Sequence, residues 1–294
     1  MSCPAWRGIG GRTRPLRFVT LGSLLALAPT AQAGGHVRAS LVSDVTSISP
    51  GRDFGLAVRL QMEEGWHTYW VNPGDSGLAT KVTWRLPEGL SVGPLQWPAP
   101  DLFGQPPVVS FGYGGEVLLI ATVTPDSSLR PGIDVPLGAK VVWVECKDVC
   151  LPGRAEVELT LPVRSGPPGR DPEASRFEET RSRVPSAPGG WRFVAGSAPE
   201  SVYLTFWSPV EPPIRAARFF PARGGFLDHS APQPLSPADG GHSLRLRRNP
   251  NASGPTDRLQ GVLVVEAADG RLAVRVDVPI REPGDARPPG PLTK

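Results

Sequence analysis

Short segments of alternating apolar and polar residues run along most of the chain, separated by turns rich in proline and glycine. Such alternation is typical of half-buried β-strands, because successive side chains of a strand point to opposite faces. In the first half of the chain it predicts strands at 54–60, 81–86, 117–123, 141–145 and 155–161, with turns between them such as 72–75. Recurring strands of this kind predict an immunoglobulin-like β-sandwich domain over residues 34–164.

The pattern changes over residues 165–190, where proline and glycine flank the segment 171–183. Asp171 at an N-cap, Pro172 at the first helical position, early glutamates and late arginines follow the order that a surface helix prefers. We therefore predict a short helical linker.

Strand patterns resume after the predicted linker and predict strands at 201–206, 214–220, 243–247, 261–265 and 272–276. They indicate a second β-sandwich domain over residues 191–282, followed by a disordered Pro/Gly-rich tail at 283–294. The predicted fold class is therefore all-β: two immunoglobulin-like β-sandwich domains joined by a short helical linker. The 36 prolines and 34 glycines of the chain fit many short strands joined by turns.

The first 33 residues are typical of a secretory signal peptide. Four arginines precede the apolar run 18–28, and Ala31-Gln32-Ala33 is a small-residue cleavage signal, so we expect cleavage after Ala33. The apolar run is about half the roughly 20 residues that a membrane-spanning helix needs, and no later run approaches that length. We expect an exported chain with no transmembrane segment after cleavage.

The basic charge of the chain belongs mainly to this leader. Without its four arginines, the 31 Lys and Arg fall to 27 against 28 Asp and Glu. A nearly neutral chain lacks the clustered basic surface that nucleic-acid binding requires, so we expect no nucleic-acid partner.

The cysteines are the most informative chemical feature. Cys3 leaves with the leader, so Cys146 and Cys150 remain, in C-x-x-x-C spacing and in an exported, oxidising compartment. Cys146 ends one strand pattern and Cys150 leads into another, with residues 147–149 as the connecting loop. Two thiols at the mouth of a hairpin can lie at the Cα separation of about 4.4–6.8 Å that a disulfide demands.

Three interpretations of this pair remain open from the residues alone. A structural disulfide closing so small a loop would contribute only about 2 kcal/mol. A redox pair is the second interpretation, although a hairpin offers no helix N-terminus to activate a thiol, and Lys147 is offset by Glu145 and Asp148. The third is metal binding: two thiolates can hold Cu(I), but a closed zinc site needs four ligands, and His67 fits an ordinary strand residue. We therefore predict no metal site and no cofactor.

Four separated motifs resemble a known family. They are Gly-Trp-His-Thr-Tyr-Trp-Val-Asn-Pro-Gly-Asp-Ser-Gly at 65–77, Leu-Gln-Trp-Pro at 95–98, Phe-Gly-Tyr-Gly-Gly-Glu-Val at 111–117 and Trp-Val-Glu-Cys-Lys-Asp-Val-Cys-Leu-Pro at 143–152. In this order they resemble the periplasmic N-terminal region of DsbD-type protein-disulfide reductases, especially the ScsB-like branch. The second β domain resembles that branch more loosely, through Phe-Phe-Pro at 219–221 and Gly-Val-Leu-Val at 261–264.

The resemblance implies a periplasmic thiol carrier with an immunoglobulin-like fold. Such a domain takes electrons from a thioredoxin-like or membrane-embedded reductase and passes them to oxidised periplasmic proteins. By position, Cys146 and Cys150 match the redox pair. In such domains an aromatic cap loop shields the cysteines until a partner docks. The matching stretch is Asp101, Leu102, Phe103 and Gly104, with Phe103 as the shielding ring and Tyr113 as its neighbour.

The chain ends at Lys294 without the membrane module or thioredoxin-like domain of the full-length family, so we expect a separate reductase to serve it as one component of a protein-disulfide reductase system. The main competing function is a non-catalytic binding or assembly module with a structural disulfide. Its ligand surface would use Trp66 and Trp70, which alternation places on one face of a strand with His67 and Tyr69 on the other. A copper-handling role is a third alternative. No nucleophile-elbow or phosphate-loop pattern favours a hydrolase or a transferase.

Overall fold

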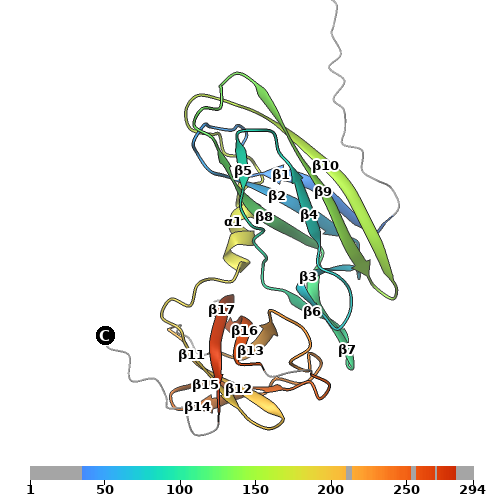
Figure 1. Ribbon diagram of the computed structural model, residues 1–294, viewed down its shortest axis with the longest axis vertical. Helices are drawn as coiled ribbons and strands as arrows, with labels where there is room; N and C mark the ends of the chain where they lie inside the picture. The colour runs from blue at the N-terminus through green and yellow to red at the C-terminus, as the bar shows by residue number, and fades with distance from the viewer. Residues whose placement is uncertain (1–34, 210–213, 253–255, 269, 283–294) are drawn as a thin grey trace, which may run out of the picture. The chain divides into compact units, whose positions relative to one another are not determined.

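The computed structural model describes residues 35–209, 214–252, 256–268 and 270–282, which form seventeen strands and one helix (Figure 1). The predicted signal peptide and the predicted disordered tail lie outside the described residues. Among those residues, no helix has both the length and the apolar character needed to cross a membrane.

Two sheets make up the first β region, residues 37–162. The four-stranded sheet has the order β1 (Val37–Ser43), β2 (Phe54–Met62), β8 (Glu116–Pro125), β5 (Leu90–Val92). The six-stranded sheet has the order β10 (Cys150–Pro162), β9 (Asp134–Cys146), β3 (His67–Gly74), β7 (Val108–Gly114), β6 (Asp101–Gln105), and β4 (Lys81–Arg85) also pairs with β9. A turn was predicted at 72–75, but β3 continues through Gly74 after a shift in register, so the turn starts at Asp75.

The core of the first β region lies between these sheets. Leu56 and Val58 of β2 belong to one buried cluster with Phe111 of β7 and Trp143 of β9. Apolar side chains from both sheets therefore exclude water from one shared layer, as in a β-sandwich.

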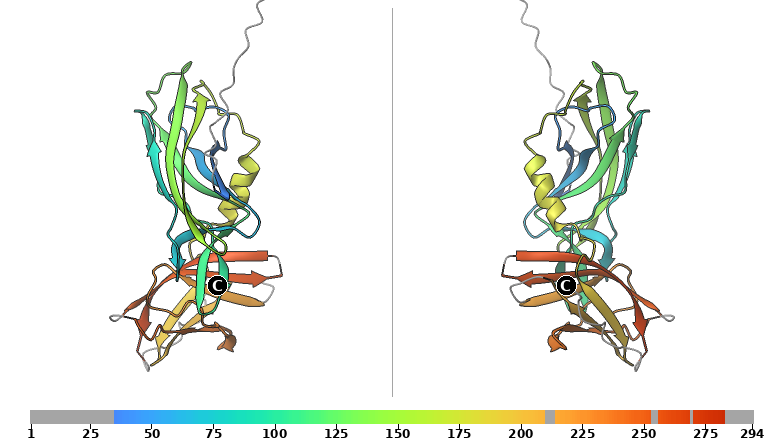
Figure 2. Two further views of the ribbon diagram at one scale, coloured as in Figure 1. Left: turned by 90° about the vertical axis from the view of Figure 1, so that its right-hand side faces the viewer. Right: turned by 90° about the vertical axis from the view of Figure 1, so that its left-hand side faces the viewer.

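The helix α1 (Ala174–Arg183) covers the outer face of the four-stranded sheet (Figure 2). Phe177 is fully buried in a small cluster with Ala57, Leu118 and Ile120, which alternate with the core-facing residues of β2 and β8. The helix begins later than its sequence pattern predicts: Glu173 is the N-cap residue, while the Asp171 carboxylate accepts a hydrogen bond from the Glu173 backbone N–H. Pro172 therefore precedes the helix.

The second β region, residues 192–281, is one seven-stranded sheet that closes around its own core. Its order is β13 (Ala216–Pro221), β16 (Arg258–Ala267), β17 (Gly270–Arg281), β11 (Arg192–Ser197), β12 (Ser201–Trp207), β15 (Gly241–Arg247), β14 (Leu235–Ala238). Phe219 and Leu263 from one end of the sheet pack with Phe206 and Leu244 from the other. The predicted all-β class, with two sandwich-like parts and a short helix between them, is confirmed.

The described residues all belong to one compact unit. Phe220, Val262 and Ala273 of the second β region belong to the same buried cluster as the core of the first. The two β regions therefore share an apolar contact, and the exact domain boundaries stay a prediction.

Candidate functional site

Cys146 and Cys150 form a disulfide at the end of the β9–β10 hairpin. The two residues are paired directly across the strands, with Cα atoms 4.2 Å apart, and residues 147–149 make the predicted connection. Cys146 is 8% exposed, whereas Cys150 is an exposed residue. Cys150 is therefore the more accessible residue of the pair, although its Sγ lies beside the buried Tyr69.

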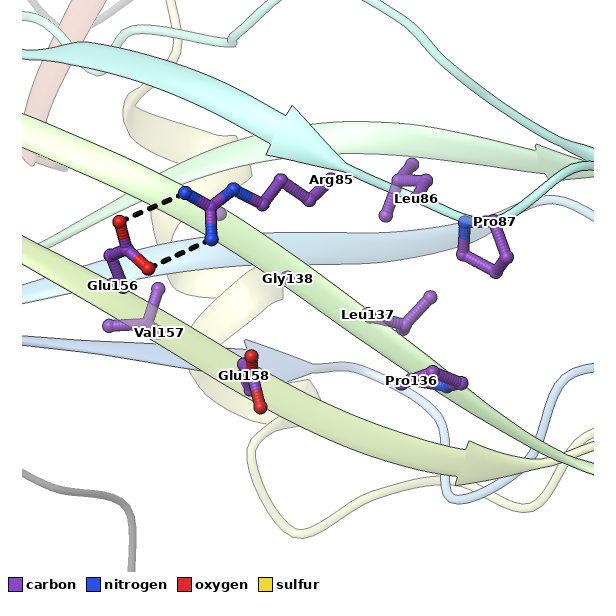
Figure 3. Close-up of a pocket in the computed structure, with 10 residues that line it drawn as sticks. Arg85, Leu86, Pro87, Pro136, Leu137, Gly138, Glu156, Val157 and Glu158 are labelled. Carbon is purple, nitrogen blue, oxygen red and sulfur yellow. Dashed lines mark hydrogen bonds and ion pairs between the residues drawn. The ribbon is translucent and has the colours of Figure 1, made fainter.

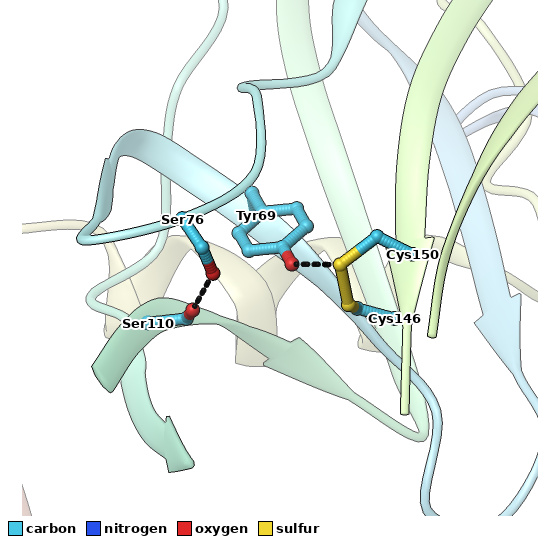
Figure 4. The surroundings of a disulfide bond; sticks show 5 residues. All are labelled: Tyr69, Ser76, Ser110, Cys146 and Cys150. Atoms are coloured by element: carbon cyan, nitrogen blue, oxygen red, sulfur yellow. Dashed lines mark hydrogen bonds between the residues drawn. A yellow bond between two sulfur atoms is a disulfide. The ribbon is translucent and has the colours of Figure 1, made fainter. Parts of the chain in front are cut away.

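Two rings of β3 line the inner side of this disulfide. His67 pairs with Cys146 across the β3–β9 ladder, and the Tyr69 hydroxyl lies 3.5 Å from Cys150 Sγ (Figure 4). The rings of His67 and Tyr69 meet edge to face, with centroids 5.2 Å apart. Alternation along β3 predicts this shared face, and Trp70 packs on the opposite face in the core.

Phe103 covers His67 from the outside. Their rings are stacked, with centroids 4.5 Å apart and an angle of 10° between the planes. The segment predicted as a cap loop is β6, the first strand of a hairpin with β7. Its alternation is too short and too interrupted by glycine and proline to be recognised as a strand in the sequence, and its pairing with β7 creates the strand.

Glycines in β7 make room for these rings. Gly112 pairs with Tyr69, and Gly114 pairs with His67. A Cβ at Gly112 would lie 1.9 Å from the Thr68 carbonyl oxygen, and one at Gly114 would lie 3.4 Å from the Phe103 ring. The glycines of the 111–117 motif thus allow the hairpin to approach β3.

The remaining residues of the predicted cap have different places. Tyr113 pairs with Thr68 and lies in the core, where its hydroxyl donates to the Pro98 carbonyl at 2.7 Å, so it does not adjoin Phe103 on the disulfide face. Burial raises the pKa of Tyr113 well above its usual value. Leu102 is partly exposed opposite Phe111, Gly104 has a positive φ, and Asp101 forms an ion pair with Arg271.

The hydroxyl of Tyr69 lies beside a pair of serines. Ser76 Oγ and Ser110 Oγ are 2.9 Å apart (Figure 4). Both serines also interact with the Tyr69 hydroxyl. Burial raises the pKa of Tyr69, and these two interactions partly offset that effect. Tyr69 therefore stays protonated at neutral pH and can donate its O–H to sulfur.

The charges around the disulfide differ from the expected arrangement. Glu145 is 1% exposed and turned inward, where its carboxylate accepts from the His36 backbone N–H at 2.7 Å and from Trp143 Nε1 at 2.8 Å. Lys147 donates instead to the Glu64 carbonyl at 3.4 Å. Burial lowers the pKa of His67, which favours its neutral form. The disulfide thus has mainly neutral groups around it.

Sequence reasoning treated His67 as an ordinary strand residue and assigned no role to Tyr69. Their alternation in β3 was a usable signal, but only the pairing of β3 with β9 shows that this face meets the cysteines. In the parts of the chain that the structure describes, no group of three or more His, Cys, Asp or Glu could hold a metal ion.

A separate groove of about 320 Å³ lies on the first β region, between β4, β9 and β10 (Figure 3). Its side is formed by Arg85, which makes two hydrogen bonds of 2.8 and 2.9 Å to the Glu156 carboxylate. Both side chains are more than half exposed. The groove contains no cysteine or histidine and includes none of the residues around the disulfide.

Comparison with known proteins finds a family model that matches most of the first β region. Residues 39–162 match the family described as thiol:disulfide interchange protein DsbD, N-terminal. The chain has no match among the curated proteins.

Two solved structures are similar to this chain. The N-terminal periplasmic domain of ScsB from Proteus mirabilis is 16% identical, with 83% of this chain and 94% of that chain covered and a TM-score of 0.56. The reduced DsbD N-terminal domain of Neisseria meningitidis is 12% identical, with 45% and 90% covered and a TM-score of 0.22. The likeness to the Proteus structure shows a common fold that extends over both β regions. The resemblance predicted from the four motifs is confirmed, and the family match together with the disulfide supports thiol–disulfide exchange in general.

Proposed function

Because residues 39–162 match the DsbD N-terminal family, we propose that this protein relays electrons in the periplasm through the Cys146–Cys150 pair. It receives them from a thioredoxin-like or membrane-embedded reductase and passes them to oxidised exported proteins. The observation that carries this proposal is the position of the disulfide: Cys150 is an exposed residue, and Cys146 is buried beside an aromatic stack.

The difference in exposure favours Cys150 as the sulfur that meets a partner. A thiolate of the reductase attacks Cys150 Sγ, the Cys146–Cys150 bond breaks, and Cys146 leaves as a thiolate that takes up a proton. The second cysteine thiolate of the reductase then attacks the first reductase cysteine in the mixed disulfide and releases Cys150 as a thiolate, which takes up a proton. The reductase becomes a disulfide, and the pair has gained two electrons and two protons.

The second half of the cycle runs in the opposite direction. The Cys150 thiolate attacks the disulfide of an exported protein, and the departing substrate sulfur leaves as a thiolate. Cys146 then attacks Cys150 in the mixed disulfide, which restores the internal bond and releases the substrate with two thiols. The Tyr69 hydroxyl, 3.5 Å from Cys150 Sγ, is placed to donate a hydrogen bond whenever this sulfur carries negative charge.

Phe103 supports a gated exchange. Its ring covers His67 directly above the β3 face that carries Tyr69. An incoming thiolate must approach along the axis of the S–S bond, so a covering ring limits access without changing the sulfur chemistry. In this proposal Phe103 shields the disulfide until a partner docks.

The first test is the reduction potential of the pair in the purified exported protein, equilibrated in defined dithiol buffers with free thiols counted. We expect a potential above about −300 mV, because structural disulfides typically lie below that value. A bond that stays oxidised until the protein is denatured would refute the relay and leave a stapled β-sandwich.

A trapping experiment tests the order of attack. A thioredoxin that lacks its second active-site cysteine, with the first blocked by thionitrobenzoate, is mixed with each reduced single-cysteine variant. We expect Cys146→Ser to form the mixed disulfide through Cys150 and to release thionitrobenzoate rapidly. The Cys150→Ser variant should react much more slowly, and equal rates would contradict the assignment.

A further inference from the structure

The second β region contacts the hairpin that carries Phe103. From β17, the Arg271 guanidinium donates to the Pro100 carbonyl at 2.5 Å and forms an ion pair with Asp101. Asp101 is the first residue of β6 and lies two positions before Phe103, so both side chains belong to the same face of this strand. One side chain of the second β region is therefore attached to the root of the cap hairpin.

The other strand of the hairpin is held by aromatic packing. Phe111 of β7 is 1% exposed, and its ring lies edge to face against Phe220, with centroids 5.1 Å apart. His229 packs on the same ring at 5.0 Å. Both contacting residues come from the second β region, so β7 rests on that region through a buried aromatic ring.

A third contact reaches the loop that follows β3. His229 Nδ1 lies 2.8 Å from Asp75 Oδ1, and the other oxygen of Asp75 accepts from the Val109 backbone N–H at 3.0 Å. Asn72 donates to the Pro221 carbonyl at 2.8 Å. The carboxylate of Asp75 thus joins the second β region to β7 near the tip of the hairpin.

Within the first β region, β7 is held by its pairing with β3 and by Phe111 and Tyr113 in the core, whereas β6 has little support of its own. β6 is the edge of the six-stranded sheet and pairs only with β7 among the described strands. An edge strand is free to move unless another element holds it. The contacts from the second β region fall on both strands of the hairpin and on its neighbouring loop, and the contact at Asp101 falls on β6, where such support is needed.

We propose that the second β region is a clamp that holds the β6–β7 hairpin, and with it Phe103, over the disulfide. Arg271 is then a positioning residue: it touches neither cysteine and acts through Asp101 and Pro100. The proposal rests on the proposed thiol exchange for its biological meaning. Its physical content is the rate at which a reductant reaches the disulfide past this hairpin.

The test measures how fast dithiothreitol reduces the disulfide of the folded protein. Each reaction converts the Cys146–Cys150 bond to two thiols and dithiothreitol to its cyclic disulfide. Arg271→Ala should raise the rate constant about fivefold, which is the effect of losing about 1 kcal/mol of hairpin closure. Arg271→Lys, which keeps the charge, should fall between this variant and the wild type.

Two further variants serve as controls. Arg258→Ala removes another arginine of the same region, whose partner is Asp277 and which does not touch the hairpin, so the rate should stay at the wild-type value. Phe103→Ala removes the shield itself and should accelerate reduction at least as much as Arg271→Ala. The reduction potential should not change in Arg271→Ala, because a clamp alters access to the bond and not its chemistry.

A wild-type rate in Arg271→Ala, with a faster rate in Phe103→Ala, would overturn the clamp and leave the shield intact. Wild-type rates in both variants would overturn both ideas. The relay itself fails by a different result, namely no exchange between the wild-type protein and a thioredoxin-like partner. Because the dithiothreitol assay needs no protein partner, the two failures are distinguishable.

Discussion

The buried carboxylate of Glu145 allows a sharp test of the polar contacts beside the disulfide. Each of its oxygens accepts one hydrogen bond, from the His36 N–H at 2.7 Å and from Trp143 Nε1 at 2.8 Å, and the residue is 1% exposed. Glu145→Gln keeps the shape of the side chain but turns one acceptor into an NH₂ donor. Because both partners are donors, one of the two hydrogen bonds must be lost.

The expected cost follows from the burial. A hydrogen bond to a charged group contributes about 1.5–3 kcal/mol, and a buried donor left without an acceptor costs about 1–3 kcal/mol. Relief from burying a charge offsets part of this loss. We therefore expect the free energy of unfolding to fall by about 2 kcal/mol, and the Tm to fall by about 4–8 °C for a chain of this size.

The assay is guanidinium chloride unfolding followed by tryptophan fluorescence, with Trp143 itself among the reporters. Glu156→Gln is the matched control, because Glu156 is 60% exposed and its partner Arg85 is also in water. The control should change the free energy by less than about 0.5 kcal/mol. Equal stability of the two variants, or a gain in Glu145→Gln, would refute the reasoning.

Three further changes have expected outcomes. Gly77→Ala should lower the free energy of unfolding by about 1–3 kcal/mol and slow exchange with thioredoxin, because Gly77 has a φ of +85° and its new Cβ would lie 2.1 Å from the Tyr69 ring. Gly115→Ala is the control, because nothing lies within 4 Å of its new Cβ and only backbone strain is added. Similar losses of stability in both variants would contradict the contact with Tyr69. Burial raises the pKa of Tyr113 in the folded state, so above the unfolded tyrosine pKa of about 10 the free energy of unfolding should fall as pH rises. Tyr113→Phe should flatten this fall in unfolding experiments between about pH 8 and 11, and an unchanged slope would contradict the reasoning. Phe177→Ala should lower the free energy of unfolding by about 3–5 kcal/mol in denaturant titrations, because the ring is fully buried between α1 and the four-stranded sheet, and a loss below about 1 kcal/mol would show that the helix is not needed there.

Several elements could be predicted because their signals are local. The alternation at 117–123 and 155–161 lies within β8 and β10, and the strand ends at Cys146 and Cys150 follow from the same pattern. The helix was also recognisable, although its start was misplaced, because Asp171 caps the preceding turn and not the helix itself.

Other elements could not be predicted because their signals are not local. β6 exists because it pairs with β7, and its own sequence carries too little alternation to identify it. The position of Tyr113 also could not be predicted from local sequence. The resemblance placed it beside the cap, but its pairing with Thr68 directs its side chain into the core.

The sequence by itself determined the all-β class, the cysteine pair and the resemblance carried by four motifs, and export through the leader stays a prediction. Each of these depends on residue type and on spacing over a few positions. Only the tertiary structure decided which face of β3 meets the cysteines, that Cys150 is the exposed residue of the pair, and that Arg271 and Phe220 contact the cap hairpin. The physical reason is that such contacts join residues far apart in the sequence, 81 positions for Tyr69 and Cys150 and 170 for Asp101 and Arg271, and strand register and packing bring them together.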